Sequence, residues 1–489
     1  MGGYMLEGFL NGLEESEIRF ISENHENFKV IVDEEHFFRL QNEIIEKDIV
    51  EGYLFNNRNF KMFGCIYNGR SISCKGYIYS SSNNPPDDLS IFDRIMFTGK
   101  PIDIFAGGSA NVMKPIKDGV DWNERLYAKE PRYWNEINTR YSAKVNGIWC
   151  EVGIDYTIYY NDRWGERNIG TCTPRFYIDF KESAGIEIIP DCYLWVFDFM
   201  KFLSFRRNIK FDEIKIYKKN IEKKFEKTGI VHFRTIDRGE YTNIDRNTIL
   251  TRDIGDKFGE LFQYIAERRQ RDTSDELFVP DNDREYKEVS HTSFLECALS
   301  FEGEYDRTQE TKTETNTEFQ QIKQLANDVV INESCKLVHQ DESDDLREEL
   351  LEYIKNRFQS DAEELKEQQT SRKKKDKIVK YAKKLLDDLD KIDFSLEEQF
   401  NNVLKKYADV LNDYKKMLAL RMKISLEGNI NLGQTFSKMR NEIGHGHPKD
   451  LDDIHAYTYQ LARCMIYVMI LDNTGISHDA IKRIIHKIF

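Results

Sequence analysis

The pattern of apolar and polar residues changes at about residue 250. Before that point, short segments alternate apolar with polar residues or are dense in Tyr, Phe, Ile and Val, which is typical of β-strands. Clusters of Asn, Asp and Gly between these segments favour turns. The pattern predicts an N-terminal β-rich region, a β-sandwich or a curled sheet, with helices inserted into it. The strand-like segments cover residues 28–32, 77–79, 148–158, 175–180, 213–217 and 229–235.

Apolar residues at helical spacing predict one helix within this first region, at about residues 191–205, and a second one directly after it, at about 253–271. The β-rich part can consist of two lobes that meet near residue 125. A polar stretch that contains Pro280 comes next and is typical of a linker. The expected organisation is an N-terminal domain over residues 1–272, a linker over 273–286 and a helical domain over 287–489.

The last part of the chain has apolar residues at three- and four-residue spacing, which predicts amphipathic helices. The segment at 450–473 is apolar nearly all round, and this favours the interior of a helical bundle or a dimer interface. The whole chain is therefore expected to be an α+β protein with a β-rich start and an all-α end. The helical segments cover residues 290–308, 315–330, 344–368, 372–390, 394–427, 432–446, 450–473 and 475–488.

The charge balance limits the kinds of partner. The chain has 71 Lys and Arg against 85 Asp and Glu, a net charge of −14, which argues against a general nucleic-acid coat protein. A nuclease needs only a local basic strip, and one candidate RNA-binding strip is present. The other interpretation of this strip is a solvated helix face balanced by nearby acidic runs. Its residues are Arg372, Lys373, Lys374, Lys375 and Lys377.

Cysteine spacing and hydropathy exclude further classes. The eight cysteines form no C-x-x-C pair, so neither a zinc site nor a redox pair is supported, and we expect no metal and no cofactor. No apolar run reaches the roughly 20 residues that a membrane-spanning helix needs. The start of the chain shows no secretion signal. We therefore expect a cytoplasmic protein that does not interact with membranes.

The most informative segment is R-N-x-x-x-H near the C-terminus, formed by Arg440, Asn441 and His445. Gly444 and Gly446 predict that a helix ends there. Asn441 and His445 are four residues apart and are therefore neighbours on a helix, so the amide can orient the imidazole or touch a substrate. An imidazole titrates near neutral pH and can move protons, and a guanidinium matches phosphate oxygens. These residue types suit cleavage of RNA.

The motif resembles the catalytic motif of the HEPN superfamily, whose typical activity is metal-independent cleavage of RNA. In that superfamily two motifs face each other, and this chain has one, so the resemblance implies a homodimer or higher homo-oligomer formed through the helical domain. It implies Arg440 and His445 as catalytic residues with Asn441 beside them. The implied product ends are a 2′,3′-cyclic phosphate and a 5′-hydroxyl.

Two other segments, residues 294–307 and 5–12, resemble ApeA-like abortive-infection proteins, which pair a β-rich N-terminal domain with a C-terminal HEPN domain. The resemblance implies an anti-phage endoribonuclease that cuts RNA, such as tRNA, when a phage-encoded trigger is present. The N-terminal domain would then sense the trigger or control the nuclease. The RNA species, the cut site, the trigger and the resting oligomer do not follow from the sequence.

Three supporting residues come from the same resemblance. HEPN proteins often place an acidic residue on the first helix near the motif arginine, and Glu302 or Glu304 can fill this role. Toxin-type members that are silenced by nucleotide transfer carry a Tyr two residues after the histidine. His447 stands at that position here, so such silencing is not implied.

Two other functions fit the same residues. The first is a non-catalytic HEPN scaffold that binds RNA or protein. The second is a metal enzyme, although histidines at the end of a helix point apart and rarely share one ion. The residues that a metal site would use are His445, His447 and His455 with Asp450, Asp452 or Asp453.

Overall fold

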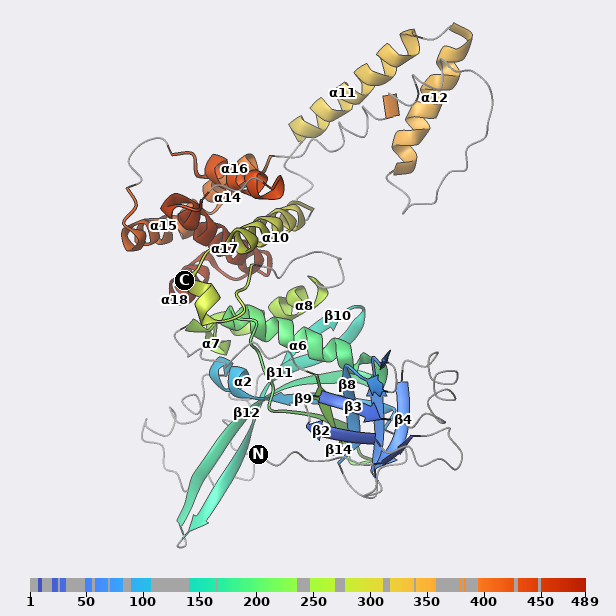
Figure 1. The fold of residues 1–489 in the computed structure, drawn as a ribbon, viewed down its shortest axis with the longest axis vertical. Coiled ribbons are helices and arrows are strands. Elements are labelled where there is room, and N and C mark those ends of the chain that lie inside the picture. The colour runs from blue at the N-terminus through green and yellow to red at the C-terminus, as the bar shows by residue number, and fades with distance from the viewer. Residues whose placement is uncertain are drawn as a thin grey trace.

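The structure is a computed structural model, and it has an N-terminal antiparallel β-sheet region followed by a C-terminal helical region (Figure 1). This is the α+β layout that the apolar pattern predicts. The described residues are 8–10, 20–24, 27–31, 49–54, 58–68, 71–81, 89–106, 140–163, 166–234, 247–268, 278–310, 317–337, 340–357, 379, 382–383, 395–425, 430–446 and 450–489.

Ten strands form one antiparallel sheet, in which alternate residues of the central strands point into an apolar core. In spatial order they are β1 (Gly8–Leu10), β4 (Ile49–Leu54), β5 (Asn59–Phe63), β8 (Gly76–Ser80), β14 (Phe225–Phe233), β13 (Glu213–Lys219), β9 (Ile91–Thr98), β12 (Glu166–Gly185), β11 (Ile148–Arg163) and β10 (Tyr141–Val145). A four-stranded sheet has the order β2 (Phe20–Asn24), β3 (Asn27–Ile31), β7 (Ser71–Ser73) and β6 (Ile66–Asn68). The expected meeting of two lobes near residue 125 lies outside the described residues.

Helices cover the apolar face of strands β9 to β12, where a sandwich would place a second sheet (Figure 1). Phe176 of β12 packs against Phe199 and Phe262 from two of these helices, at ring-centroid distances of 5.9 and 5.6 Å. The helix expected at 253–271 is interrupted, because Gly255 adopts a positive φ of 63°. The covering helices are α2 (Lys100–Phe105), α6 (Ile189–Ser204), the short α7 (Thr251–Ile254) and α8 (Phe258–Arg268).

The helical region is built around one buried helix, α17, whose residues 457–471 are buried with the exception of Gln460. It packs against α10, α14, α15, α16 and α18, so the apolar segment at 450–473 lies in the interior of a bundle. Within the described residues, no helix is long and apolar enough to cross a membrane. The helices are α9 (Asp283–Lys287), α10 (His291–Glu310), α11 (Thr317–Lys336), α12 (Gln340–Arg357), α14 (Leu396–Lys406), α15 (Ala408–Met422), α16 (Leu432–Gly444), α17 (Asp453–Asn473) and α18 (His478–Ile488).

Two segments differ from their predicted form. The helix expected at 394–427 is two helices, because Tyr407 leaves the helical conformation with φ −105° and ψ 28°. Helices α11 and α12 form a hairpin that stands apart from the bundle, with a small core of its own around Ile331, Leu346 and Leu350 (Figure 1). Most of the helix expected at 372–390 lies outside the described residues.

The two regions share one apolar core. Tyr467 of α17 stacks on Phe202 of α6 with ring centroids 4.4 Å apart, and its hydroxyl donates to the Phe202 carbonyl. Phe205, next to α6, packs on the C-terminal Phe489 at 4.9 Å. The sheet with its helical layer is therefore joined directly to the bundle. Because this core is closely packed, a structural change in one region affects the packing of the other.

Candidate functional site

The R-N-x-x-x-H motif occupies the last turn of α16. The helix begins at Asn431, whose side chain accepts a hydrogen bond from the Gln434 amide at 3.1 Å. It ends where the His445 amide donates to the Asn441 carbonyl at 2.9 Å, and Gly446 follows with a positive φ of 75°. The glycine end that the sequence predicts is therefore present, and it leaves the motif at the tip of the helix.

Arg440 is held from two sides. Its Nη2 donates to Glu302 Oε2 of α10 at 3.2 Å, and its Nη1 donates to the side-chain oxygen of Asn441 at 3.3 Å. The Arg440 side chain is 32% exposed and that of Glu302 is 28% exposed. Its Nε is buried and has no hydrogen-bond partner within the described part of the chain. The guanidinium is therefore oriented but not fully satisfied.

His445 is exposed at the end of the same helix. Among the described residues, its imidazole has no hydrogen-bond or ion-pair partner, so it is available for proton transfer or for contact with another molecule. The side-chain oxygen of Asn441 accepts a hydrogen bond from Arg440. That the Asn441 amide orients the imidazole or touches a substrate stays a prediction. The helix places Asn441 beside both residues, and the stronger charged donor takes the amide oxygen. His447 lies outside the described residues.

The two candidate glutamates of α10 have different roles. Glu302 contacts Arg440, whereas Glu304 is fully buried at 0% exposure and faces the N-terminal region. Residues two apart on a helix are separated by about 200° around its axis, so they cannot serve the same side. The partners of Glu304 are the Tyr264 hydroxyl at 2.6 Å, Arg268 Nη2 at 3.0 Å and Arg307 Nη2 at 3.1 Å.

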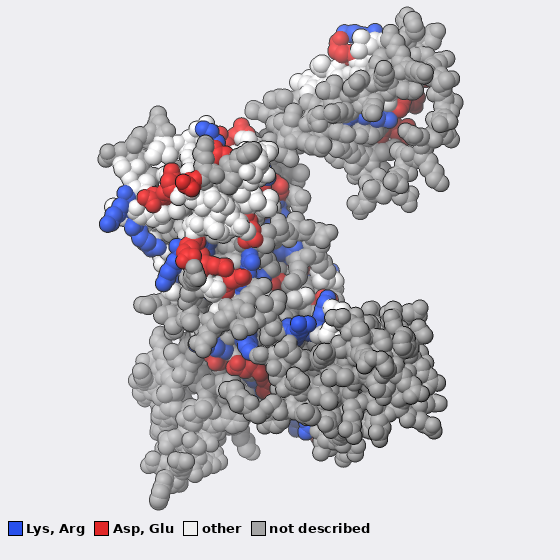
Figure 2. Space-filling model, in the orientation of Figure 1, with Lys and Arg blue, Asp and Glu red and all other residues white. Residues whose placement is uncertain are grey.

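The basic strip at residues 372–377 lies outside the described residues. Farther along the same basic run, Lys383 Nζ is 3.0 Å from Glu349 Oε1 of α12. This contact is of the kind expected if acidic residues balance the run. Figure 2 shows acidic and basic side chains side by side over the coloured part of the helical region.

The residues of the metal alternative do not gather in the described chain. His455 Nδ1 lies 2.6 Å from Asp452 Oδ1, and Asp452 also caps α17 by accepting from the His455 amide. Both contacts are local to the start of the helix. Within the described residues, no three His, Cys, Asp or Glu side chains are placed to hold one ion. The predictions of no metal and no cofactor remain predictions.

One cluster of titratable groups was not foreseen. His478 at the start of α18 contacts Asp409 Oδ2 through Nδ1 at 2.8 Å and Asp472 Oδ1 through Nε2 at 3.4 Å. The Asp409 carboxylate raises the pKa of His478. Tyr407 donates to Asp472 at 2.8 Å, so the cluster ties three helices together. Its members lie far apart in the sequence, and no local spacing signals it.

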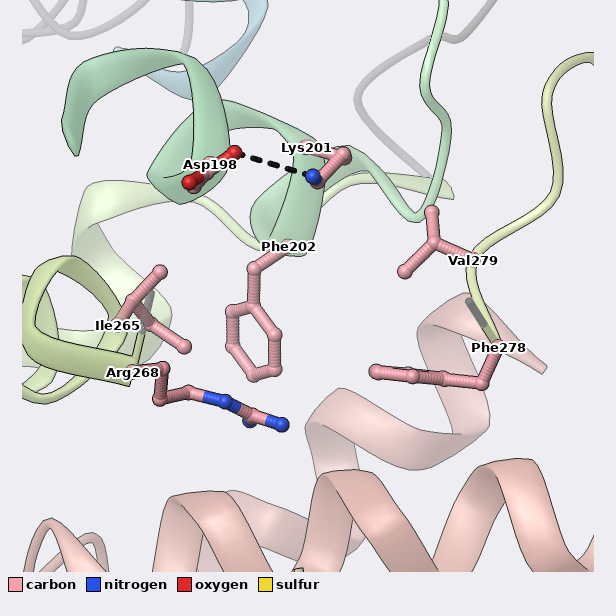
Figure 3. A pocket seen from close by; sticks show the side chains of 7 residues that line it. All are labelled: Asp198, Lys201, Phe202, Ile265, Arg268, Phe278 and Val279. Atoms are coloured by element: carbon pink, nitrogen blue, oxygen red, sulfur yellow. Dashed lines mark hydrogen bonds and ion pairs between the residues drawn. The ribbon is translucent and has the colours of Figure 1, made fainter. Parts of the chain in front are cut away.

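A small cavity lies between α6, α8 and the segment before α9 (Figure 3). Its volume of about 20 Å³ is enough for roughly one water molecule. Asp198 and Lys201 form an ion pair of 3.0 Å at its edge. No sequence pattern indicated this cavity, and none of its lining residues belongs to α10 or α16. The lining residues are Asp198, Lys201, Phe202, Ile265, Arg268, Phe278 and Val279.

Comparisons of the whole chain with models of protein families, with curated proteins and with solved structures found no match.

Proposed function

We propose that the chain is a metal-independent RNA endonuclease of the HEPN type, with Arg440 and His445 as its catalytic residues. The observation that carries the proposal is the last turn of α16. There an oriented guanidinium and an exposed imidazole stand five residues apart at the tip of a rigid helix. In this proposal the bundle formed by α10 and α14 to α18 is the HEPN domain.

Each group has a task in the cleavage. Arg440 binds the scissile phosphate through the exposed part of its guanidinium, since the side chain as a whole is 32% exposed. Glu302 keeps the guanidinium in place before substrate arrives. One His445 removes the proton of the ribose 2′-hydroxyl, and the 2′-oxygen forms a bond to phosphorus. The bond from phosphorus to the 5′-oxygen breaks, and a second His445 protonates that oxygen.

The second histidine would come from a second copy of the chain. The exposed helix tip at His445 leaves room for two motifs to face each other across a two-fold axis. The products are then a 2′,3′-cyclic phosphate and a 5′-hydroxyl. We further propose that the enzyme acts in anti-phage defence by abortive infection, on an RNA such as tRNA, when a phage-encoded trigger is present.

The test is cleavage of total bacterial RNA by the purified chain in EDTA, with and without phage-infected lysate. His445→Ala is the inactive variant. His486→Ala is the matched control, because His486 is also exposed at the C-terminal end of a helix but lies outside the motif. We expect discrete cuts by the unmodified chain and by His486→Ala, and none by His445→Ala.

Two results would contradict the proposal. Cleavage that survives in His445→Ala would assign the activity to another site or to a contaminant. Absence of any cut, even with infected lysate, would leave an RNA- or protein-binding scaffold as the better description of the domain.

A further inference from the structure

Helix α10 connects two polar contacts that belong to different parts of the molecule. Glu302 faces the bundle and pairs with Arg440, while Glu304 faces the N-terminal region and meets Tyr264 and Arg268 of α8. The two carboxylates are separated by only about 3 Å along the helix axis. A displacement of α10 at one contact is therefore carried almost unchanged to the other.

The Glu304 contact is strong and buried. Glu304 is fully enclosed, and its carboxylate accepts from one hydroxyl and pairs with two guanidinium groups. Burial and the Glu304 carboxylate raise the pKa of Tyr264, so its hydroxyl keeps the proton that it donates. Charge-assisted hydrogen bonds in an environment of low dielectric constant fix geometry closely. This set of contacts holds α10 against α8, which itself packs on β10 and β11.

On its other side α10 is packed firmly against α16. Phe294 and Phe301 of α10 lie 5.0 and 6.0 Å from Phe436 of α16, measured between ring centroids. Phe436 is buried one turn before Arg440. Close packing of rigid elements transmits small movements rather than absorbing them. The path from the N-terminal region to the motif thus consists of α8, α10 and α16.

We infer that Glu304 is a positioning residue through which the N-terminal β-rich region sets the geometry of Arg440. The consequence of this inference for catalysis rests on the proposed function. The structural coupling of α8 to α16 through α10 does not depend on it. When α8 holds Glu304, α10 presents Glu302 to Arg440. When α8 moves or the Glu304 contacts break, the pair of Glu302 and Arg440 loosens and the phosphate-binding group loses its orientation.

The experiment measures backbone hydrogen exchange in residues 432–446 of the full-length chain by mass spectrometry, without RNA. The main variant is Tyr264→Phe, which removes one hydrogen bond to Glu304 and keeps the ring. Arg268→Met is the stronger variant. The control is Lys487→Met, which breaks another contact between the two regions, the 2.6 Å pair of Lys487 with Asp253, away from α10.

We expect several-fold faster exchange at the end of α16 in Tyr264→Phe and Arg268→Met, and no change there in Lys487→Met. In a Glu302→Gln background the two α8 variants should add nothing further, because the pair through which they act is already weakened. A purely structural role of Tyr264 would instead add its full effect in that background.

Unchanged exchange at α16 in both α8 variants would overturn the inference, as would an equal change in Lys487→Met or full additivity with Glu302→Gln. RNA cleavage by the same variants separates the two proposals. If the cleavage rate at saturating RNA falls in the same variants in which exchange at α16 becomes faster, both the nuclease and the link through α10 are supported. Coupled exchange in a chain that never cleaves RNA would support the link through α10 and contradict the nuclease.

Discussion

The two ends of the polar path through α10 are unlike each other. At Glu304 a carboxylate with no exposed surface is matched by a hydroxyl and two guanidinium groups. At the tip of α16, the Arg440 side chain is 32% exposed and His445 is exposed without a partner among the described residues. Satisfied buried polar groups stabilise and fix a structure, whereas unsatisfied exposed groups are available for a ligand. The difference supports a stabilising role for the first end and agrees with the chemical role that we propose for the second.

The largest expected effect is at the buried end. Glu304→Ala leaves Arg268 and Arg307 enclosed with less compensating charge, so the free energy of unfolding should fall by about 3–5 kcal/mol. Glu302→Ala, at the exposed end of the path, should cost about 1 kcal/mol or less because solvent screens that pair. Urea unfolding of both variants measures the difference. Equal losses would erase the distinction between the two ends.

The junction between the regions should show the next effect. Tyr467→Phe removes the hydroxyl that donates to the Phe202 carbonyl, which then keeps the Phe205 amide as its donor. The expected loss in the free energy of unfolding is that of one hydrogen bond, about 0.5–1.5 kcal/mol. Tyr53→Phe is the control and should change little, because the Tyr53 side chain of β4 is exposed. A Tyr467→Phe chain as stable as its parent would mean that the shared core does not depend on this bond.

A smaller effect depends on pH. Hydrogen bonding to Asp409 raises the pKa of His478, so protonated His478 favours the folded chain. This stabilisation is complete below the ordinary value of 6.5 and is lost as pH rises through the higher folded-state pKa. His478 is 40% exposed, so the gain is about 0.5 kcal/mol after screening. Thermal unfolding of His478→Gln and its parent should converge as pH rises through that range, and a gap that persists at high pH would exclude this cause.

The smallest effect on stability is expected at the motif itself. His445→Ala should change the free energy of unfolding by no more than about 0.5 kcal/mol, like the control His486→Ala, because each removes an exposed side chain. The same substitution should reduce RNA cleavage by about 100-fold or more. A large loss of stability in His445→Ala would show that the residue is structural, which would contradict the proposed difference between the Glu304 contacts and the tip of α16.

Local patterns allowed much of the fold to be predicted. The period of apolar residues located α6, α10, α16 and α17, and Gly444 with Gly446 located the end of α16. Chain-distant contacts were not predictable. No residue pattern near Tyr407 indicated a break between α14 and α15. The helical layer on the sheet could not be predicted either, because it depends on how α6 and α8 pack.

In the candidate site, too, the local features could be predicted from the sequence and the contacts between distant segments could not. Arg440, Asn441 and His445 follow from one short motif, and their position at the helix tip follows from helix geometry. The choice between Glu302 and Glu304 required the orientation of α10, which the sequence does not contain. Glu304 and Arg307 are three residues apart on one helix, so their ion pair could be predicted from the sequence. Tyr264 and Arg268 come from a different region of the chain, so their contacts with Glu304 could not.

The proposed attack by the ribose 2′-hydroxyl can be tested with an RNA substrate in which the 2′-hydroxyls at the mapped cut sites are replaced by 2′-O-methyl groups. Cleavage is followed in EDTA, and the fragment ends are identified by mass spectrometry. We expect 2′,3′-cyclic phosphate and 5′-hydroxyl ends from unmodified RNA and no cut at the methylated positions. Cleavage of the methylated RNA at the same positions would contradict it, because that result would remove the 2′-hydroxyl from the reaction.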